Sequence, residues 1–359
     1  MLGVYVHIPY CRVACPYCDF VKQPIEGEAP GAYASALARE IESFEGPRTA
    51  QSLFFGGGTP SLLTPSDLDT IFAAFHRRFD TMSPEISMEV NPDDVTEERA
   101  ALWRSLGVNR ITIGVQSFDD ATLNYLGRCH DAHTARRACG IIASTFENWG
   151  LDLIFGAPPI DAWRSSLAEC VNIGPPHVST YSLTFEQNTP FWRRRNEAID
   201  PDDSLELYRM GMDALADWDH YEISNYARAG SQSGHNCIYW RNEEYAGFGP
   251  GAYSYLDGVR SRNAPHINRY LTAPGVKSEI LDLAEDEIKV ETLIQHFRTR
   301  RGITDDYYAE RFGGPVDGDF GAALGELQSR ELLERDDHGY RPTQTGYELN
   351  DEIGLALLP

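Results

Sequence analysis

Three cysteines near the N-terminus have the type and spacing of metal ligands. Cys11, Cys15 and Cys18 form a C-x-x-x-C-x-x-C run. Thiolates are soft ligands that suit zinc or an iron–sulfur cluster. A structural zinc needs four ligands, and no second C-x-x-C pair occurs in the sequence to complete the set. A [4Fe–4S] cubane with three protein ligands leaves one iron open for a small molecule. We favour this interpretation over zinc or three unrelated thiols.

A glycine-rich segment and four polar residues are further candidates for the same site. Residues 55–60 read Phe-Gly-Gly-Gly-Thr-Pro and lack the Lys-Ser/Thr of a phosphate-binding loop, so a tight turn is the plain interpretation. Glu89 lies inside an apolar run, where a carboxylate needs either an ion pair or a ligand. The other candidates are Gln116, Arg128 and Asp152. Each of these three alone is compatible with a structural role.

The elements that must position these residues alternate along the first half of the chain. The predicted strands cover residues 3–7, 52–55, 86–90, 110–115, 151–155 and 177–183. The predicted helices cover residues 33–44, 64–79, 96–106, 133–146 and 162–173. Strands that alternate with helices form parallel sheets, in which functional groups gather at the carboxyl ends of the strands. We therefore predict an α/β fold, a partial (β/α)6 TIM-like barrel.

The pattern changes after about residue 201. We predict a helix over 204–218, a glycine- and aromatic-rich stretch to residue 255, and a turn-rich connector over 256–284. Helices near 285–298 and 320–329 precede a hairpin with an Asp-His-Gly turn. This order predicts a small C-terminal helical domain resembling a winged helix over 285–359, after a barrel domain over 1–255.

Composition restricts the class of protein. The chain has 359 residues with 31 basic and 54 acidic side chains, a net charge of −23, so we do not expect it to bind nucleic acid over a broad surface. The sequence contains no apolar run of about 20 residues, so it predicts no membrane span. No signal peptide is visible either, and we therefore expect a cytoplasmic protein. Seven cysteines argue against a disulfide framework. The four outside the triplet are Cys129, Cys139, Cys170 and Cys237.

The cysteine spacing resembles that of the radical S-adenosylmethionine (SAM) superfamily, and Tyr17 before the last cysteine fits the same pattern. The resemblance implies that the open iron chelates the amino and carboxylate groups of SAM. One electron from the cluster then cleaves SAM to a 5′-deoxyadenosyl radical. The residues expected to contact SAM are Tyr5, Tyr17, Gly57, Gly58, Thr59, Glu89, Gln116, Arg128 and Asp152.

A narrower resemblance, to the oxygen-independent coproporphyrinogen III oxidase group and its haem chaperone relatives, covers essentially the whole chain. It rests on the opening motif over residues 5–11, on residues 247–252 and 262–263, and on a His-Asn-x-x-Tyr-Trp motif over residues 235–240. The resemblance implies haem binding. The residues expected to bind haem are His235, Tyr239, Trp240 and Cys237.

Two departures favour the haem chaperone branch over the oxidases. Oxidases carry a fourth cysteine two residues after the third, where this chain has Phe20. They also have a longer segment before the first strand. We therefore expect a haem chaperone on a radical SAM scaffold, without coproporphyrinogen oxidase activity.

The alternatives are an oxygen-independent coproporphyrinogen III oxidase, a haem-methylating or haem-degrading radical SAM enzyme, and a binding module with a structural zinc. The cofactors expected of the chaperone are a [4Fe–4S] cluster, SAM and haem. Its expected partners are haem-acceptor proteins and an electron donor for the cluster.

Overall fold

The computed structural model describes residues 2–27, 30–80 and 85–358. One twelve-stranded sheet dominates it, and the parallel α/β class predicted from the sequence is confirmed. The six predicted strands are β1 (Gly3–Ile8), β4 (Ser52–Gly57), β5 (Glu85–Val90), β6 (Arg110–Gln116), β7 (Asn148–Phe155) and β8 (His177–Ser182). They lie side by side in chain order and all pairs are parallel.

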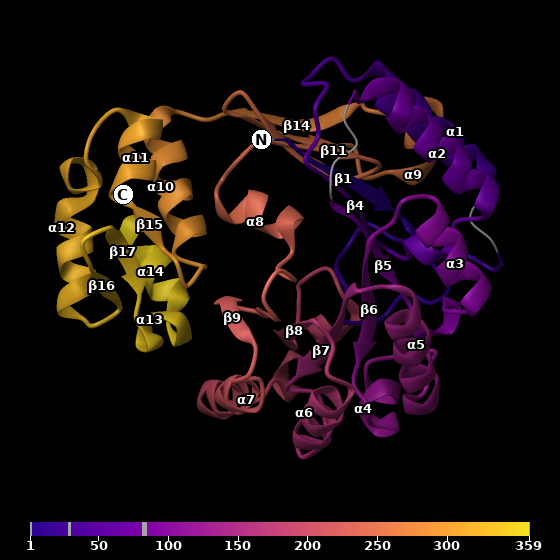
Figure 1. Cartoon of the computed structure of the whole chain (residues 1–359), viewed down its shortest axis with the longest axis horizontal. Helices are drawn as coiled ribbons and strands as arrows, with labels where there is room; N and C mark the ends of the chain where they lie inside the picture. Colours follow the sequence, from indigo (N-terminus) through magenta and orange to yellow (C-terminus); the bar gives the residue numbers. More distant parts are fainter. Residues whose placement is uncertain (1, 28–29, 81–84, 359) are drawn as a thin grey trace.

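Helices cover the outer face of this curved sheet (Figure 1). They are α1 (Gly31–Ser43), α2 (Pro65–Arg78), α3 (Glu97–Ser105), α4 (Asp120–Tyr125), α5 (Ala132–Thr145), α6 (Ala162–Ile173) and α7 (Pro201–Ala214). Their ends follow local signals. Thr64 and Asp67 form a capping box at the start of α2, and Gly174 ends α6 in the left-handed conformation. Three short 3₁₀ segments are also present. The first, η1 (Pro60–Leu62), follows β4, and η2 (Pro92–Asp94) follows β5; η3 (Pro190–Glu197) lies between β8 and α7.

The sheet extends beyond the prediction at both edges. Strand β11 (Tyr245–Phe248) pairs in parallel with β1, so β1 lies between β4 and β11. The antiparallel additions are β9 (Asp219–Glu222), β10 (Asn225–Ala227), β12 (Tyr253–Leu256), β13 (Val259–Asn263) and β14 (Lys277–Asp282). The segment expected as a connector, 256–284, therefore contributes two strands to the main sheet. The short strands β2 (Tyr10–Cys11) and β3 (Gln23–Pro24) form a separate pair.

A buried network ties α1 to the turn after β11. The Glu40 carboxylate accepts hydrogen bonds from the Gly249 N–H at 2.9 Å, from Asn263 Nδ2 at 2.7 Å and from the Tyr270 hydroxyl at 2.6 Å. Tyr270 lies on α9 (Ile267–Thr272). These bonds satisfy a carboxylate that would otherwise be costly to bury. The network joins the first helix of the chain to the last part of the barrel.

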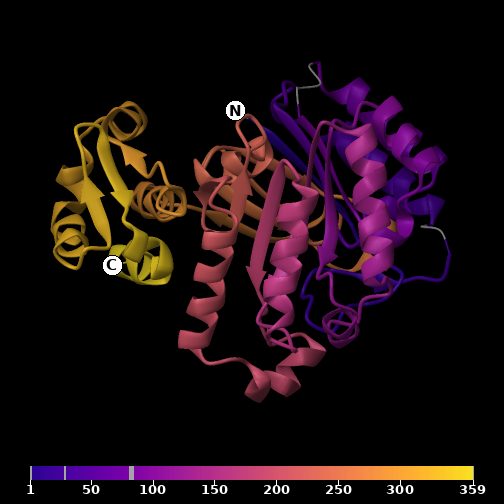
Figure 2. The ribbon, with the colours of Figure 1, turned by 60° about the horizontal axis from the view of Figure 1, so that its bottom comes forward.

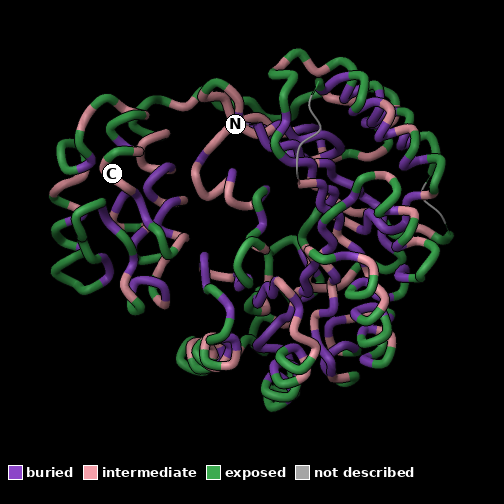
Figure 3. Tube along the Cα trace, viewed as in Figure 1, coloured by how far each residue is buried: buried purple, intermediate pink, exposed green. Residues whose placement is uncertain are grey.

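The C-terminal part has its own hydrophobic core, separate from the core around the main sheet. Its elements are α10 (Glu285–His296), β15 (Ile303–Thr304), α11 (Asp305–Phe312), α12 (Val316–Ser329), β16 (Leu333–Arg335), β17 (Gly339–Pro342), α13 (Gln344–Glu348) and α14 (Asn350–Leu357). Through β17 this is the element order of a winged helix. Figure 2 shows it as a block beside the barrel, and Figure 3 shows its buried interior. In the described residues no helix is long and apolar enough to cross a membrane.

The C-terminal part contacts the barrel through α8 (Gly234–Trp240), which lies inside the arc of the sheet (Figure 1). The Arg241 carbonyl accepts a hydrogen bond from the Tyr307 hydroxyl at 2.7 Å. Asn242 donates through Nδ2 to Thr292 Oγ1 at 3.0 Å, and its carbonyl accepts from Arg311 at 2.7 Å. The end of α8 is thus one polar attachment point of the second core, and the ion pairs Arg260–Glu291 and Arg209–Glu348 are two others.

Candidate functional site

A cavity of about 440 Å³ opens at the carboxyl ends of the parallel strands. Its walls include Gly57 from β4, Glu89 from β5, Gln116 from β6 and Asp152 from β7. A volume of this size suits a small molecule or cofactor. The rule that functional groups gather at the ends of parallel strands therefore applies to this chain.

The cysteine loop forms one wall of the cavity. Cys11 ends β2, and Cys15 and Cys18 follow in the loop; all three line the cavity. The loop is held by Arg12, whose guanidinium lies 2.6 Å from the carboxylate of Asp94. The Asp94 side chain is fully buried and also accepts a hydrogen bond from Ser61 at 2.7 Å. A buried carboxylate with both partners in place fixes the loop against η1 and η2.

The three thiols at the cavity wall provide the kind of ligand set that an iron–sulfur cluster uses. Over the described ranges, no three His, Cys, Asp or Glu side chains converge closely enough to hold one metal ion. The thiolates of a cubane each bind a different iron and need not converge on one point. The cavity also carries a fourth thiol that the sequence did not assign to it, the exposed Cys129. It follows Arg128, the residue that contacts the sulfur of Cys15 at 3.4 Å.

The glycine-rich segment packs directly on β1. The Gly58 N–H donates to the Ile8 carbonyl at 2.7 Å. A Cβ atom at Gly58 would lie 2.6 Å from the Tyr10 carbonyl oxygen and 2.7 Å from that of Ile8, both backbone atoms that cannot move aside. Gly57 adopts a φ of +103°, a region that favours glycine. The turn therefore needs glycine for close backbone approach, and this leaves its edge open to a ligand.

Two half-buried carboxyl groups, Glu89 and Asp152, lie in the wall of the cavity. Desolvation, and to a smaller extent the nearby Asp152, raise the pKa of Glu89 to about 8, while the Gly57 N–H at 3.2 Å opposes the shift. Burial also raises the pKa of Asp152 to about 6. Oδ1 of Asp152 has no hydrogen-bond partner. A buried acceptor of this kind is suited to a ligand hydroxyl or amino group.

We expect the cofactor-free protein to lose about 1 kcal/mol of stability between about pH 7 and pH 8 through Glu89 alone. The folded chain keeps the Glu89 proton up to a pKa of about 8, whereas the unfolded chain releases it near 4.5. The folded state binds more protons in this interval, so its stability falls as pH rises. Urea unfolding of wild type and Glu89→Gln at both pH values measures the effect. The exposed Glu98→Gln is the matched control, and an equal pH dependence in Glu89→Gln would contradict the assignment.

Arg128 is held by a residue that the sequence analysis missed. Arg128 donates through Nη2 to Asn91 Oδ1 at 2.7 Å and to the Gly114 carbonyl at 3.0 Å. Asn91 in turn donates through Nδ2 to Thr59 Oγ1 at 3.1 Å. Asn91 follows β5 directly, so the strand-end rule that selected Glu89 would have found it. Gln116, at the end of β6, adopts a left-handed φ of 68° and also lines the cavity.

Eight of the nine predicted SAM residues line the cavity, and Tyr5 does not. The eight are Tyr17, Gly57, Gly58, Thr59, Glu89, Gln116, Arg128 and Asp152. Tyr5 lies in the middle of β1, below the strand end, since each residue of a strand advances about 3.3 Å. Its hydroxyl contacts His7 Nδ1 at 3.0 Å. Tyr5 therefore contacts His7 beneath the cavity, and its contact with SAM stays a prediction.

The predicted haem residues lie at the opposite end of the barrel, on and beside α8. His235 is fully buried: Nδ1 lies 2.7 Å from Ser52 Oγ and Nε2 lies 2.8 Å from the Tyr239 hydroxyl. Burial lowers the pKa of His235 to about 3, so its ring is neutral. One of these hydrogen bonds would have to break before either His235 or Tyr239 could bind iron. The ring of Trp240 faces the Arg298 guanidinium at 4.7 Å.

Cys237 differs from the other three because it lines an open groove. The groove, of about 1340 Å³, runs along the amino ends of the strands and includes apolar Phe146 and Ile238 and the basic Arg104 and Arg241. Burial raises the pKa of Cys237 to about 11, so its thiol is protonated in the free protein.

Comparisons with known proteins agree with this geometry. Residues 5–164 match the radical SAM superfamily, and residues 283–349 match the HemN C-terminal domain. The chain is 32% identical to "Heme chaperone HemW" of Lactococcus lactis, covering 98% of this chain and 96% of that protein. It is 32% identical to "Heme chaperone HemW" of Bacillus subtilis, covering 100% and 99%.

The fold also resembles a solved structure. The coproporphyrinogen III oxidase HemN of Escherichia coli superposes with a TM-score of 0.86 at 19% identity, covering 99% of this chain and 89% of that one. This likeness concerns the fold, including the C-terminal part.

Proposed function

We propose a function from one premise: this chain belongs to the HemW haem chaperone family of the radical SAM superfamily. In this proposal the protein binds haem and delivers it to acceptor proteins. Its cysteine loop holds a [4Fe–4S] cluster with SAM at the open iron. The observation that carries the proposal is the single cavity that joins Cys11, Cys15 and Cys18 to eight of the predicted SAM residues.

When both groups are bound, the cluster would supply one electron that reduces the sulfonium of SAM. The residues of this chain bind and orient the two groups. The glycine turn would present its backbone to the methionine part of SAM, and position 58 must be glycine because a Cβ there would strike the backbone of Ile8 and Tyr10. Asp152 and Glu89 offer acceptors below it. Arg128 is fixed by Asn91 and by the Gly114 carbonyl, and its Nη1 group points to the sulfur of Cys15 at the cavity wall.

We place haem at the other end of the barrel, in the groove beside α8, with Cys237 as the ligand that needs least rearrangement. Its sulfur lies at a mostly polar groove that includes apolar Phe146 and Ile238, and Arg104 and Arg241 in the same lining suit the carboxylates of a porphyrin. Cysteine thiolate is an established haem ligand type, and binding to iron would displace its proton. His235 and Tyr239 then act as packing partners that hold α8 in place.

We expect haem titration of wild type to give a Soret band. In Cys237→Ser the band should shift and the affinity for haem should fall about tenfold or more, because the iron loses its thiolate. Absorbance titration under anaerobic conditions measures both quantities. Cys129→Ser is the matched control, since it removes an exposed thiol at the opposite end. Transfer of the bound haem to an apo-haem protein, followed by the acceptor's own spectrum, tests delivery.

Two outcomes would contradict the proposal. Formation of protoporphyrinogen from coproporphyrinogen III, SAM and a reductant would support the oxidase instead. Ring opening or methylation of added haem would support a haem-modifying enzyme. An unchanged Soret band and affinity in Cys237→Ser would remove only Cys237 as the ligand and would leave the chaperone function standing.

A further inference from the structure

A run of three arginines on η3 stands out in this acidic chain. Arg193, Arg194 and Arg195 are consecutive in a protein whose net charge is −23. Arg194 is neutralised by Glu197, at 2.6 Å. In the part of the chain that the structure describes, Arg193 and Arg195 form no ion pair, and both are exposed. Two positive charges are therefore available to a partner.

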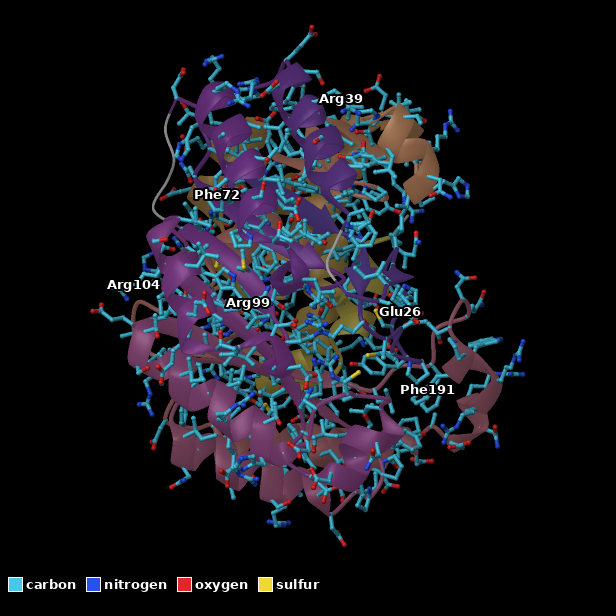
Figure 4. All side chains as sticks on the ribbon, turned by 90° about the vertical axis from the view of Figure 1, so that its right-hand side faces the viewer. Glu26, Arg39, Phe72, Arg99, Arg104 and Phe191 are labelled. Atoms are coloured by element: carbon cyan, nitrogen blue, oxygen red, sulfur yellow. The ribbon has the colours of Figure 1, made fainter. Side chains whose placement is uncertain are left out.

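The η3 segment packs directly on the cysteine loop. The Phe191 N–H donates to the carbonyl of Pro16, the residue that follows Cys15, at 3.0 Å. Phe191 is only 1% exposed, and its ring lies 6.3 Å from that of Tyr17. Figure 4 shows the segment around Phe191 projecting at the edge of the molecule. The arginines thus begin two residues after a direct backbone contact with the loop that carries the cluster cysteines.

Exposed apolar side chains lie on the same two segments. Val13 and Phe20, on the cysteine loop, are 46% and 58% exposed, and Trp192 on η3 is 36% exposed. Val13 and Phe20 also line the cavity, so they reach its mouth. Apolar side chains with charges around them are typical of protein–protein interfaces, where complementary charge speeds the encounter.

We propose that Arg193 and Arg195 on η3, with Trp192 and the exposed side chains of the cysteine loop, form the docking surface for an acidic one-electron carrier protein. We call this the η3 surface. The inference rests on the proposed function, because it needs the cluster. One electron passes from the reduced flavin or iron–sulfur centre of the carrier to the cluster. The carrier is oxidised by one electron, the cluster is reduced by one, and no bond forms or breaks.

The position of the η3 surface favours an electron carrier over a haem acceptor. It borders the loop of Cys11, Cys15 and Cys18 at the carboxyl ends of the strands. The groove beside Cys237 lies at the amino ends. Electron transfer requires close approach to the cluster, whereas haem would leave from the opposite end.

The test uses the full chain with its cluster reconstituted and a reduced acidic flavodoxin as the probe. Stopped-flow bleaching of the cluster absorbance gives the second-order rate of reduction, and the paramagnetic resonance signal of the reduced cluster confirms it. We expect Arg193→Glu to lower this rate about three- to tenfold at low ionic strength, with the difference shrinking as salt screens the charges. Arg301→Glu, an equal charge reversal on an exposed arginine of the C-terminal part, should change the rate less than about twofold.

Photoreduced deazaflavin, a small uncharged reductant, should reduce the cluster equally fast in all three proteins. Equal rates of cluster reduction by flavodoxin in Arg193→Glu and Arg301→Glu would overturn the inference. A rate that does not depend on ionic strength would also overturn it. A variant that slows haem transfer but not cluster reduction would assign the surface to the acceptor and also overturn it. If reconstitution yields no cluster at all, the proposed function fails first, so the two failures are distinguishable.

Discussion

A Cys11→Ala/Cys15→Ala/Cys18→Ala variant should leave anaerobic reconstitution colourless, with iron reduced from about four atoms per chain to background. The three thiols line the cavity wall together, and in the proposed site they are the sulfur ligands of the cluster. Iron and sulfide analysis with the visible spectrum measures the loss. Circular dichroism should show an unchanged fold, because the barrel core does not depend on the loop.

Cys129→Ser is the sharp control for this result. Cys129 lines the same cavity and its removal also costs a thiol, but it lies outside the C-x-x-x-C-x-x-C run. It should keep the full iron content. A cluster that survives in the triple variant would refute the assignment of the three cysteines. A cluster lost with Cys129→Ser would show that the fourth thiol is a ligand.

Gly58→Ala should weaken SAM binding about a hundredfold. The new Cβ would lie 2.6 Å and 2.7 Å from two backbone carbonyl oxygens, so either the turn or β1 must shift. A displacement of about 1 Å in a positioned site can cost about a hundredfold in rate, and we expect a loss of affinity of the same order because the same turn holds SAM. Equilibrium dialysis with SAM on the reconstituted protein measures the affinity, and thermal unfolding measures the accompanying loss of stability.

Gly140→Ala makes the same chemical change where it should be harmless. Gly140 lies within α5, and nothing lies within 4 Å of the position its Cβ would take. Alanine favours a helix over glycine by about 1 kcal/mol, so this variant should be as stable as wild type or more so. Equal SAM affinity in wild type and Gly58→Ala would mean that the turn does not position the ligand.

The six parallel strands could be predicted because each is a short β-rich run between local helix signals such as the Thr64 cap. Strand β11 could not be predicted in the same way. Its Gly247 lies so close to Tyr253 that a Cβ would meet the Tyr253 carbonyl oxygen, and a glycine-rich segment reads as a loop. Its partner β1 is distant in the sequence. The pairing is therefore visible only in three dimensions, and β13 and β14 extend this same edge of the sheet.

In the candidate site, too, some features could be predicted from the sequence and others could not. The strand-end rule selected Glu89, Gln116 and Asp152, and they do line one cavity. The rule does not measure depth along a strand, so it could not place Tyr5 below the site. It also could not show that Cys129 joins the cavity or that both nitrogens of His235 are occupied, because these facts depend on packing between distant segments.

The position of β1 between β4 and β11 has a consequence for synthesis. The ribosome makes β1 first, yet its second neighbour and the Gly249 N–H that anchors Glu40 on α1 emerge only after most of the barrel. Domains fold as units once their parts are available. The loop of Cys11, Cys15 and Cys18 therefore gains its final support late in translation. We expect the cluster to be inserted into a completed chain, after the nascent barrel has closed its last parallel pair.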